Sequence, residues 1–141
     1  PAPAAKLDPS VFPLIDYFTP NESEASFYVS GDIANKDDAE QYGQEFINLG
    51  VKNILVTLGD QGVYFQNDKE KHFEPALDLG SKVIDTSGAG DAFSGAFATA
   101  LCEEKSIPDA IKFANAFAGI STTRIGTANS MPSREEIEKL L

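Results

Sequence analysis

The chain has 141 residues, of which 42% are apolar and 23% charged, and its formal net charge at pH 7 is −11. This length and composition predict one soluble globular domain over residues 1–141, and the negative charge argues against nucleic acid or an anionic membrane surface as a partner. The sequence contains neither a run of about eighteen apolar residues nor a basic-then-apolar leader, so we expect a cytoplasmic protein.

Cysteine and methionine usage adds two expectations. Cys102 is the only cysteine, which excludes an internal disulfide and a cysteine-based metal site. Because it lies in an apolar helical run, we expect a buried thiol. The chain begins at Pro1 without an initiator methionine, and its only methionine is Met131. We therefore expect a fragment of a longer polypeptide.

In chain order, the first half predicts a short helix over 7–15, a strand at 16–18, helices over 22–29 and 36–49, and strands at 53–58, 63–65 and 71–74. Asn21 and Asn35 suit the N-caps of the second and third helices, and Gly50 suits the end of the third. The continuous apolar run at 53–58 is typical of a strand buried on both faces. The short turn that follows it predicts a hairpin.

The second half predicts helices over 92–104, 109–123 and 133–140. Pro108 suits the first turn of the middle helix, and Ser133 with Glu136 forms a capping box for the last. Strands mixed with helices predict an α/β layered fold.

The most informative segment is the glycine-rich turn from Asp85 to Asp91, directly before an alanine-rich helix. Unpaired N–H groups and the positive end of the helix dipole gather at a helix start, so this position favours an anion. Glycines let the backbone approach a phosphate closely. A carboxylate at Asp91 could take a proton from an acceptor hydroxyl. The segment therefore predicts phosphoryl transfer.

Two other nucleotide motifs do not fit this turn. No lysine follows a glycine pair, which excludes a Walker A loop, and Phe93 stands where the dinucleotide fingerprint requires its third glycine. A simpler interpretation stays open, in which the turn only starts a buried helix and Asp91 complements the helix dipole.

Three further stretches have both a binding and a structural interpretation. A carboxylate in residues 21–24, just after a strand, could hold hydrated Mg²⁺ or serve in ordinary helix capping. The turn at 57–62 could present amides and the Thr57 hydroxyl to phosphates, or be a plain hairpin turn. The small side chains at 114–119 suit close packing against a helix or a flat ring.

Taken in order, these stretches resemble the phosphofructokinase B type of carbohydrate kinases, and the ribokinase-like members of that family in particular. The matching segments are residues 1–4, 19–25, 57–63, 85–93, 123–126 and 130–132. The resemblance covers the whole chain but only the C-terminal half of such an enzyme. It implies a ribokinase-like layered α/β fold, in which this chain forms the C-terminal portion of the central sheet with its flanking helices.

The resemblance implies ATP-dependent phosphorylation of a sugar hydroxyl, with conversion of D-ribose to ribose 5-phosphate as the first expectation. Asp91 matches the family's catalytic base, and the amides of Gly88, Ala89 and Gly90 match its anion hole. Asn21 and Glu24 match a motif associated with Mg²⁺ and phosphate placement. The remaining ATP contacts implied are Thr57, Gly59 and Gly62 near the phosphates and Asn115 at the adenine pocket.

Ribokinase-like enzymes also bind a potassium ion (K⁺) that orders the anion hole. The corresponding positions, several of which would act through backbone carbonyls, are Asp85, Ser87, Ser121, Arg124, Gly126 and Ser130.

The family's sugar-contacting Gly-Gly motif and its β-strand lid lie in the N-terminal half, outside this chain. We therefore expect the chain to be inactive or nearly so alone, and to lack the homodimer interface that the lid supplies. Fructokinase, adenosine kinase and other nucleoside kinases stay open as identities, because the substrate half is absent. A nucleotide-binding module without catalysis is the alternative from another class.

Overall fold

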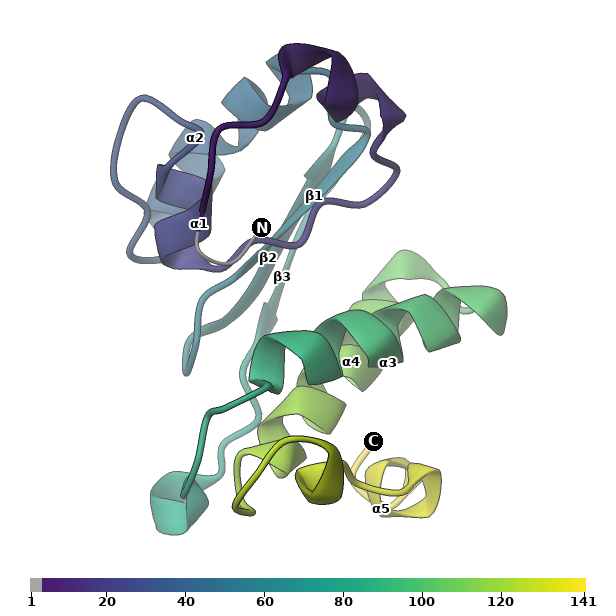
Figure 1. The fold of residues 1–141 in the computed structure, drawn as a ribbon. Helices are drawn as coiled ribbons and strands as arrows, with labels where there is room; N and C mark the ends of the chain where they lie inside the picture. The colour runs from purple at the N-terminus through teal and green to yellow at the C-terminus, as the bar shows by residue number, and fades with distance from the viewer. Residues whose placement is uncertain (1–3) are drawn as a thin grey trace. The chain divides into compact units, whose positions relative to one another are not determined.

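The computed structural model describes residues 4–141, which form two compact units: one ends at Pro75 and the other runs from Ala76 to Leu141 (Figure 1). Most of the first matching segment, Pro1 to Pro3, lies outside the described residues. The order of elements is α/β, as predicted. Within residues 4–141, no helix combines the length and the apolar character needed to cross a membrane.

The first unit contains a three-stranded antiparallel sheet in the order β1–β2–β3, formed by Asn53–Thr57, Gly62–Asn67 and Lys71–Pro75. The predicted hairpin is confirmed, because Thr57 pairs with Val63 across a short turn. Three consecutive residues of β1, Ile54 to Val56, are fully buried, as its unbroken apolar run predicts. The strand expected at 16–18 is reduced to one parallel bridge between Phe18 and Ile54.

Two side-chain-capped α-helices accompany this sheet. The helix α2, Lys36–Asn48, packs on β1 and β2, and α1, Glu22–Ser26, packs on β1. The predicted caps Asn21 and Asn35 both accept a hydrogen bond from the backbone of their helices' first turns. The expected helix at 7–15 is a short 3₁₀ helix over Pro9–Leu14. The core beneath these elements contains edge-to-face pairs among Phe12, Phe18 and Tyr28, a geometry that aromatic rings favour.

The second unit is helical: α3, Ala89–Cys102, and α4, Ile107–Ser121, pack side by side, and α5, Arg134–Glu138, contacts α4 (Figure 1). Two 3₁₀ turns complete it, Gly80–Lys82 and Ala128–Ser130. The predicted capping box of α5 is confirmed, since Ser133 and Glu136 each bond the other's backbone.

The structure corrects three expectations about the helices of the second unit. The helix α3 begins at Ala89 rather than at 92, because Gly88 adopts a left-handed conformation with φ +76° and forms the N-cap. The helix α4 begins and ends two residues before the expected 109–123, because Ser106 caps it by accepting from the Asp109 N–H. Cys102 is exposed, not buried. It lies in the last turn of α3, on a face that this unit leaves uncovered.

Candidate functional site

The turn from Asp85 to Asp91 ends in the first turn of α3. Gly88 is the N-cap, and Asp91 is the third residue of the helix, exposed to solvent. The other four α-helices of the described chain have a side-chain cap, whereas α3 has none. The Ala89 N–H donates to the Thr86 carbonyl at 3.2 Å, whereas the next N–H groups, which have no partner within the helix, receive no side-chain cap and lie beside a carboxylate. This arrangement suits an incoming anion together with a proton acceptor.

The carboxylate of Asp85 holds this turn to the loop that follows α4. One oxygen accepts from the Ser87 N–H at 2.9 Å, and the other accepts from the Gly126 N–H at 3.0 Å. The Asp85 N–H in turn donates to the Thr122 carbonyl at 3.0 Å. The hydrogen bonds from Gly126 and Ser87 lower the pKa of the Asp85 carboxyl to about 2. Asp85 is therefore ionised at neutral pH and clamps the start of the turn.

The residues expected at the potassium ion lie around this clamp. The Ser121 carbonyl accepts from the Arg124 N–H at 3.3 Å. The buried hydroxyl of Ser130 donates to the Thr127 carbonyl at 2.6 Å. Together with Asp85 and Gly126, these contacts bring the predicted set into one region of the second unit. Their carboxylate and carbonyl oxygens are the donor type that a hard cation prefers.

Two features of the structure favour glycine at position 88. Its φ of +76° is unfavourable for a residue with a side chain, and an added Cβ would lie 3.1 Å from Cγ2 of Thr127. Gly80 has φ +53° but nothing within 4 Å of an added Cβ. An alanine at either position would therefore have an unfavourable left-handed backbone, but only at position 88 would its methyl group also crowd a neighbouring side chain.

We expect Gly80→Ala to lower the free energy of unfolding by about 1–2 kcal/mol, the cost of the left-handed backbone. Gly88→Ala should lose a further ~1 kcal/mol or more, because the methyl group crowds Thr127. Urea denaturation of both variants beside the unaltered chain measures the difference. Equal losses would show that the contact with Thr127 carries no energy.

A cavity of about 470 Å³ lies beside Asp91 in the same unit. Small residues of α3, Gly95 and Ala96 among them, line one side, and Phe113 and Phe117 of α4 line another. Arg134 of α5 also lines it, with its guanidinium over the Phe113 ring. Sequence reasoning missed Arg134 and Phe113, because only the packing of α4 and α5 against α3 places them near Asp91.

The first unit gathers the residues expected to contact ATP phosphates at the C-terminal end of β1. Asn21 forms a parallel bridge with Thr57, and the Thr57 N–H donates to the Pro20 carbonyl at 3.0 Å. Gly59 and Gly62 follow in the hairpin turn with φ values of +52° and +128°. An added Cβ at Gly59 would lie 3.4 Å from a carboxylate oxygen of Glu22.

Asn21 and Glu24 also form the capping box of α1. The Asn21 side-chain oxygen accepts from the Glu24 N–H at 3.0 Å, and a Glu24 oxygen accepts from the Asn21 N–H at the same distance. This confirms the capping interpretation of the segment. Glu24 retains a second carboxylate oxygen. Elsewhere, Asn115 lies half-buried in the middle of α4.

Side chains alone do not build a metal centre in the described chain: no three His, Cys, Asp or Glu gather as a metal-holding group within residues 4–141. Mg²⁺ commonly keeps several waters and uses one or two carboxylates with substrate phosphates. The single carboxylate at Glu24 fits that pattern.

Comparison with known proteins defines the class. A family model described as pfkB family carbohydrate kinase matches residues 1–134. A ribokinase of Haemophilus influenzae is 38% identical over 141 residues, which cover 100% of this chain and 45% of that protein. The chain therefore spans about half the length of the curated relatives that it matches.

Solved structures agree on the fold. The Arabidopsis thaliana ribokinase complexed with ribose and ATP superposes with a TM-score of 0.87 at 32% identity, covering 94% of this chain and 43% of that one. A putative ribokinase II from E. coli, in complex with ATP and Mg²⁺, gives a TM-score of 0.80 at 26% identity, with 93% and 40% covered. The predicted ribokinase-like fold is confirmed.

The chain belongs to the pfkB family of carbohydrate kinases. Within that family, the relative from Haemophilus and both of these structures carry the name ribokinase.

Proposed function

We propose that this chain is the nucleotide-binding, catalytic part of a ribokinase, which transfers the γ-phosphoryl group of ATP to D-ribose and yields ribose 5-phosphate. The observation that carries the proposal is the exposed carboxylate of Asp91 in the uncapped first turn of α3. The structures of ribokinases with ribose and ATP, and with ATP and Mg²⁺, support it.

In this proposal, Asp91 accepts the proton of the sugar hydroxyl as its oxygen attacks the γ-phosphorus. The amides of Gly88, Ala89 and Gly90 stabilise the negative charge of the transferring group. The bond from the γ-phosphorus to the bridging oxygen breaks, and ADP leaves. Asp85 keeps the turn in place through its bonds to Ser87 and Gly126.

The ATP phosphates are assigned to Asn21, Thr57, Gly59 and Gly62, and the adenine to Asn115. Glu24 would hold Mg²⁺ through its waters, and the ion would supply charge neutralisation at the phosphates. Potassium would be held by oxygens of Asp85, Ser87, Ser121, Arg124, Gly126 and Ser130. It would supply a fixed positive charge beside the anion hole. We also place the intact kinase in the cytoplasm as a homodimer, joined by a lid outside this chain.

The exposed face of α3 supports the view that more of the polypeptide completes the site. Between Asp91 and Glu103 this helix has no charged residue, and its exposed positions include Gly95, Ala98 and Thr99. Helices that face water normally carry charged residues on that side. We assign this face to the N-terminal half of the kinase, which would bring the sugar to Asp91.

The test is a coupled assay of ADP release by the intact kinase with ribose, deoxyribose, fructose and adenosine as acceptors. We expect ribose to have the highest kcat/KM and the 141-residue chain alone to show no turnover. A preference for fructose or adenosine would replace the substrate assignment. Turnover by the chain alone would overturn the assignment of the sugar contacts to the other half. If the intact protein binds ATP by calorimetry yet phosphorylates no acceptor, it is a nucleotide-binding module.

A further inference from the structure

We propose that Glu136 is a positioning residue for the phosphoryl-transfer turn: through Arg124 it holds the loop 122–126, and that loop holds Asp85. The functional part of this inference rests on the proposed role of residues 85–91. All the contacts behind it lie within the second unit. Glu136 acts on Asp85 indirectly, through Arg124 and the loop 122–126.

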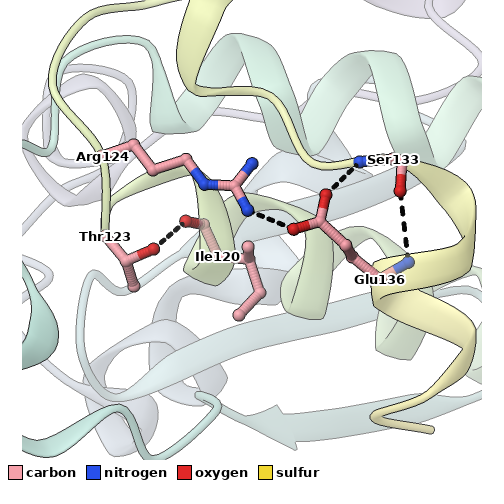
Figure 2. A network of polar contacts seen from close by, with 5 residues as sticks. All are labelled: Ile120, Thr123, Arg124, Ser133 and Glu136. Carbon is pink, nitrogen blue, oxygen red and sulfur yellow. Dashed lines mark hydrogen bonds and ion pairs between the residues drawn. The ribbon is translucent and has the colours of Figure 1, made fainter.

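Figure 2 shows the contacts that join α5 to the loop 122–126. The Arg124 guanidinium donates to one carboxylate oxygen of Glu136, and the other oxygen accepts from the Ser133 N–H at 2.8 Å. The Ser133 hydroxyl accepts from the Glu136 N–H at 3.3 Å. One carboxylate oxygen of Glu136 therefore caps its own helix, and the other binds Arg124 of the loop. The hydrogen bonds from Ser133 and Arg124 lower the pKa of the Glu136 carboxyl.

The helix α5, which contributes Glu136, is held in place by several contacts. Ile137 is fully buried, and α5 packs on α4. At the first residue of the helix, Arg134 forms an ion pair with Glu103 and lies over the Phe113 ring. The buried Ile137, the ion pair of Arg134 and the capping box therefore anchor α5 within its unit.

Thr122 at the start of the loop is buried, and its carbonyl accepts from the Ile84 N–H at 2.8 Å. The middle of the loop has fewer contacts. Ile125 is 79% exposed, so no apolar anchor holds the middle of the loop. Gly126 has no side chain and a φ of +100°. The Thr123 hydroxyl donates to the Ile120 carbonyl within the same segment, which ties the loop only to the end of α4. Besides the bond between Gly126 and the Asp85 carboxylate, the contact between Arg124 and Glu136 joins this loop to another segment through a side chain.

The position of the loop determines the position of Asp85. Asp85 forms hydrogen bonds with loop residues that precede and follow Arg124 in the sequence. Its N–H donates to the Thr122 carbonyl, and its carboxylate accepts from the Gly126 N–H. A shift of residues 122–126 would therefore carry Asp85 with it, and Ser87 through the same carboxylate. Since the side chains of Arg124 and Glu136 are 38% and 43% exposed, their pairing adds little to overall stability. We assign to this pair an effect on the position of the loop 122–126.

The experiment compares two substitutions in the intact kinase. Glu136→Gln removes the charge that attracts Arg124, while glutamine at this position still completes a capping box. Ser133→Ala removes the cap hydroxyl and leaves the carboxylate that meets Arg124. Hydrogen exchange by mass spectrometry over peptides 122–128 and 134–140 is measured, together with kcat, the KM for ribose and the potassium concentration for half-maximal activity.

We expect Glu136→Gln to speed exchange in 122–128. It should also lower kcat, or raise the potassium requirement, by about tenfold, as for loss of an outer-shell contact at a metal site, with the KM for ribose unchanged. Ser133→Ala should speed exchange only in 134–140. Arg124→Gln leaves α5 intact and should reproduce the Glu136→Gln result. The double variant should then show no additional loss.

Equal behaviour of Glu136→Gln and Ser133→Ala would overturn the positioning role, as would additive losses in the double variant. The two proposals fail separately. If the unaltered kinase phosphorylates no sugar, the proposed function is wrong, and exchange in 122–128 still decides whether Glu136 holds the loop.

Discussion

Asp91→Asn in the intact kinase should lower kcat by roughly a hundred- to ten-thousand-fold, the usual contribution of a general base, with a much smaller change in KM. Asparagine has nearly the same size and cannot accept the proton of the sugar hydroxyl. Because Asp91 is exposed in the first turn of α3, the substitution removes no buried contact. Steady-state kinetics with ribose and ATP measures the effect.

The chain contains a matched control for this substitution. Asp109 is the third residue of α4, as Asp91 is of α3, and both are acidic residues in a first turn. Asp109→Asn removes a charge from the same position of a neighbouring helix and also changes the acceptor of the Ser106 hydroxyl, so we expect its loss of stability to be at least as large. We expect it to leave kcat close to that of the unaltered enzyme. Near-normal turnover of Asp91→Asn would remove Asp91 from its assigned role.

Gly95→Leu should prevent the N-terminal half of the kinase from completing the site, so that activity falls to background. An added Cβ at Gly95 has nothing within 4 Å, so the side chain fits this chain as it stands. It would, however, project into the cavity beside Asp91. Replacing glycine within a helix also improves helix propensity. A loss of activity would therefore come from blocked packing and not from unfolding.

Gly95→Ala is the control, since it makes the same improvement in helix propensity and adds only a methyl group at the cavity. The two halves are produced as separate chains, mixed, and assayed for ribose phosphorylation and for co-elution by gel filtration. We expect Gly95→Ala to retain assembly and Gly95→Leu to abolish it. Full activity with Gly95→Leu would show that the cavity face of α3 stays uncovered in the intact kinase.

Local patterns predicted much of the fold. The caps Asn21, Asn35 and Ser133 act on N–H groups only three residues away, so the spacing in the sequence contains the whole interaction. The hairpin after residue 57 was predictable for the same reason, because a short turn leaves the returning strand few other pairings.

Predictions failed where the deciding contact was distant or absent. After Asp91 the helix α3 has no charged residue, so its sequence has no charged stripe to show which side faces out, and Cys102 was wrongly expected to be buried. The start of α3 was misplaced because the glycines at 88 and 90 allow several backbone conformations, and Gly88 adopts a left-handed one that begins the helix at Ala89. The pair of Arg124 with Glu136 joins two segments that only the packing of α5 brings together.

The roles of the site residues came from the order of the motifs, not from any one of them. Asn21 with Glu24 is a capping box in its own right, and the turn at 57–62 is a hairpin turn in its own right. Their assignment to ATP stays a prediction. The structure adds that Asn21 and Thr57 are neighbours. It also shows that Asp85 and Gly126 are bonded across 41 residues of sequence.

The exposed thiol of Cys102 has a practical consequence. It is the only cysteine in the chain and lies at the surface near the end of α3. A lone surface thiol can couple two copies of a protein through an intermolecular disulfide in air, so preparations need a reductant. The same isolation makes it a single attachment point for a fluorophore. A dye placed there would report, by a change in emission, when another polypeptide covers the uncharged face of α3.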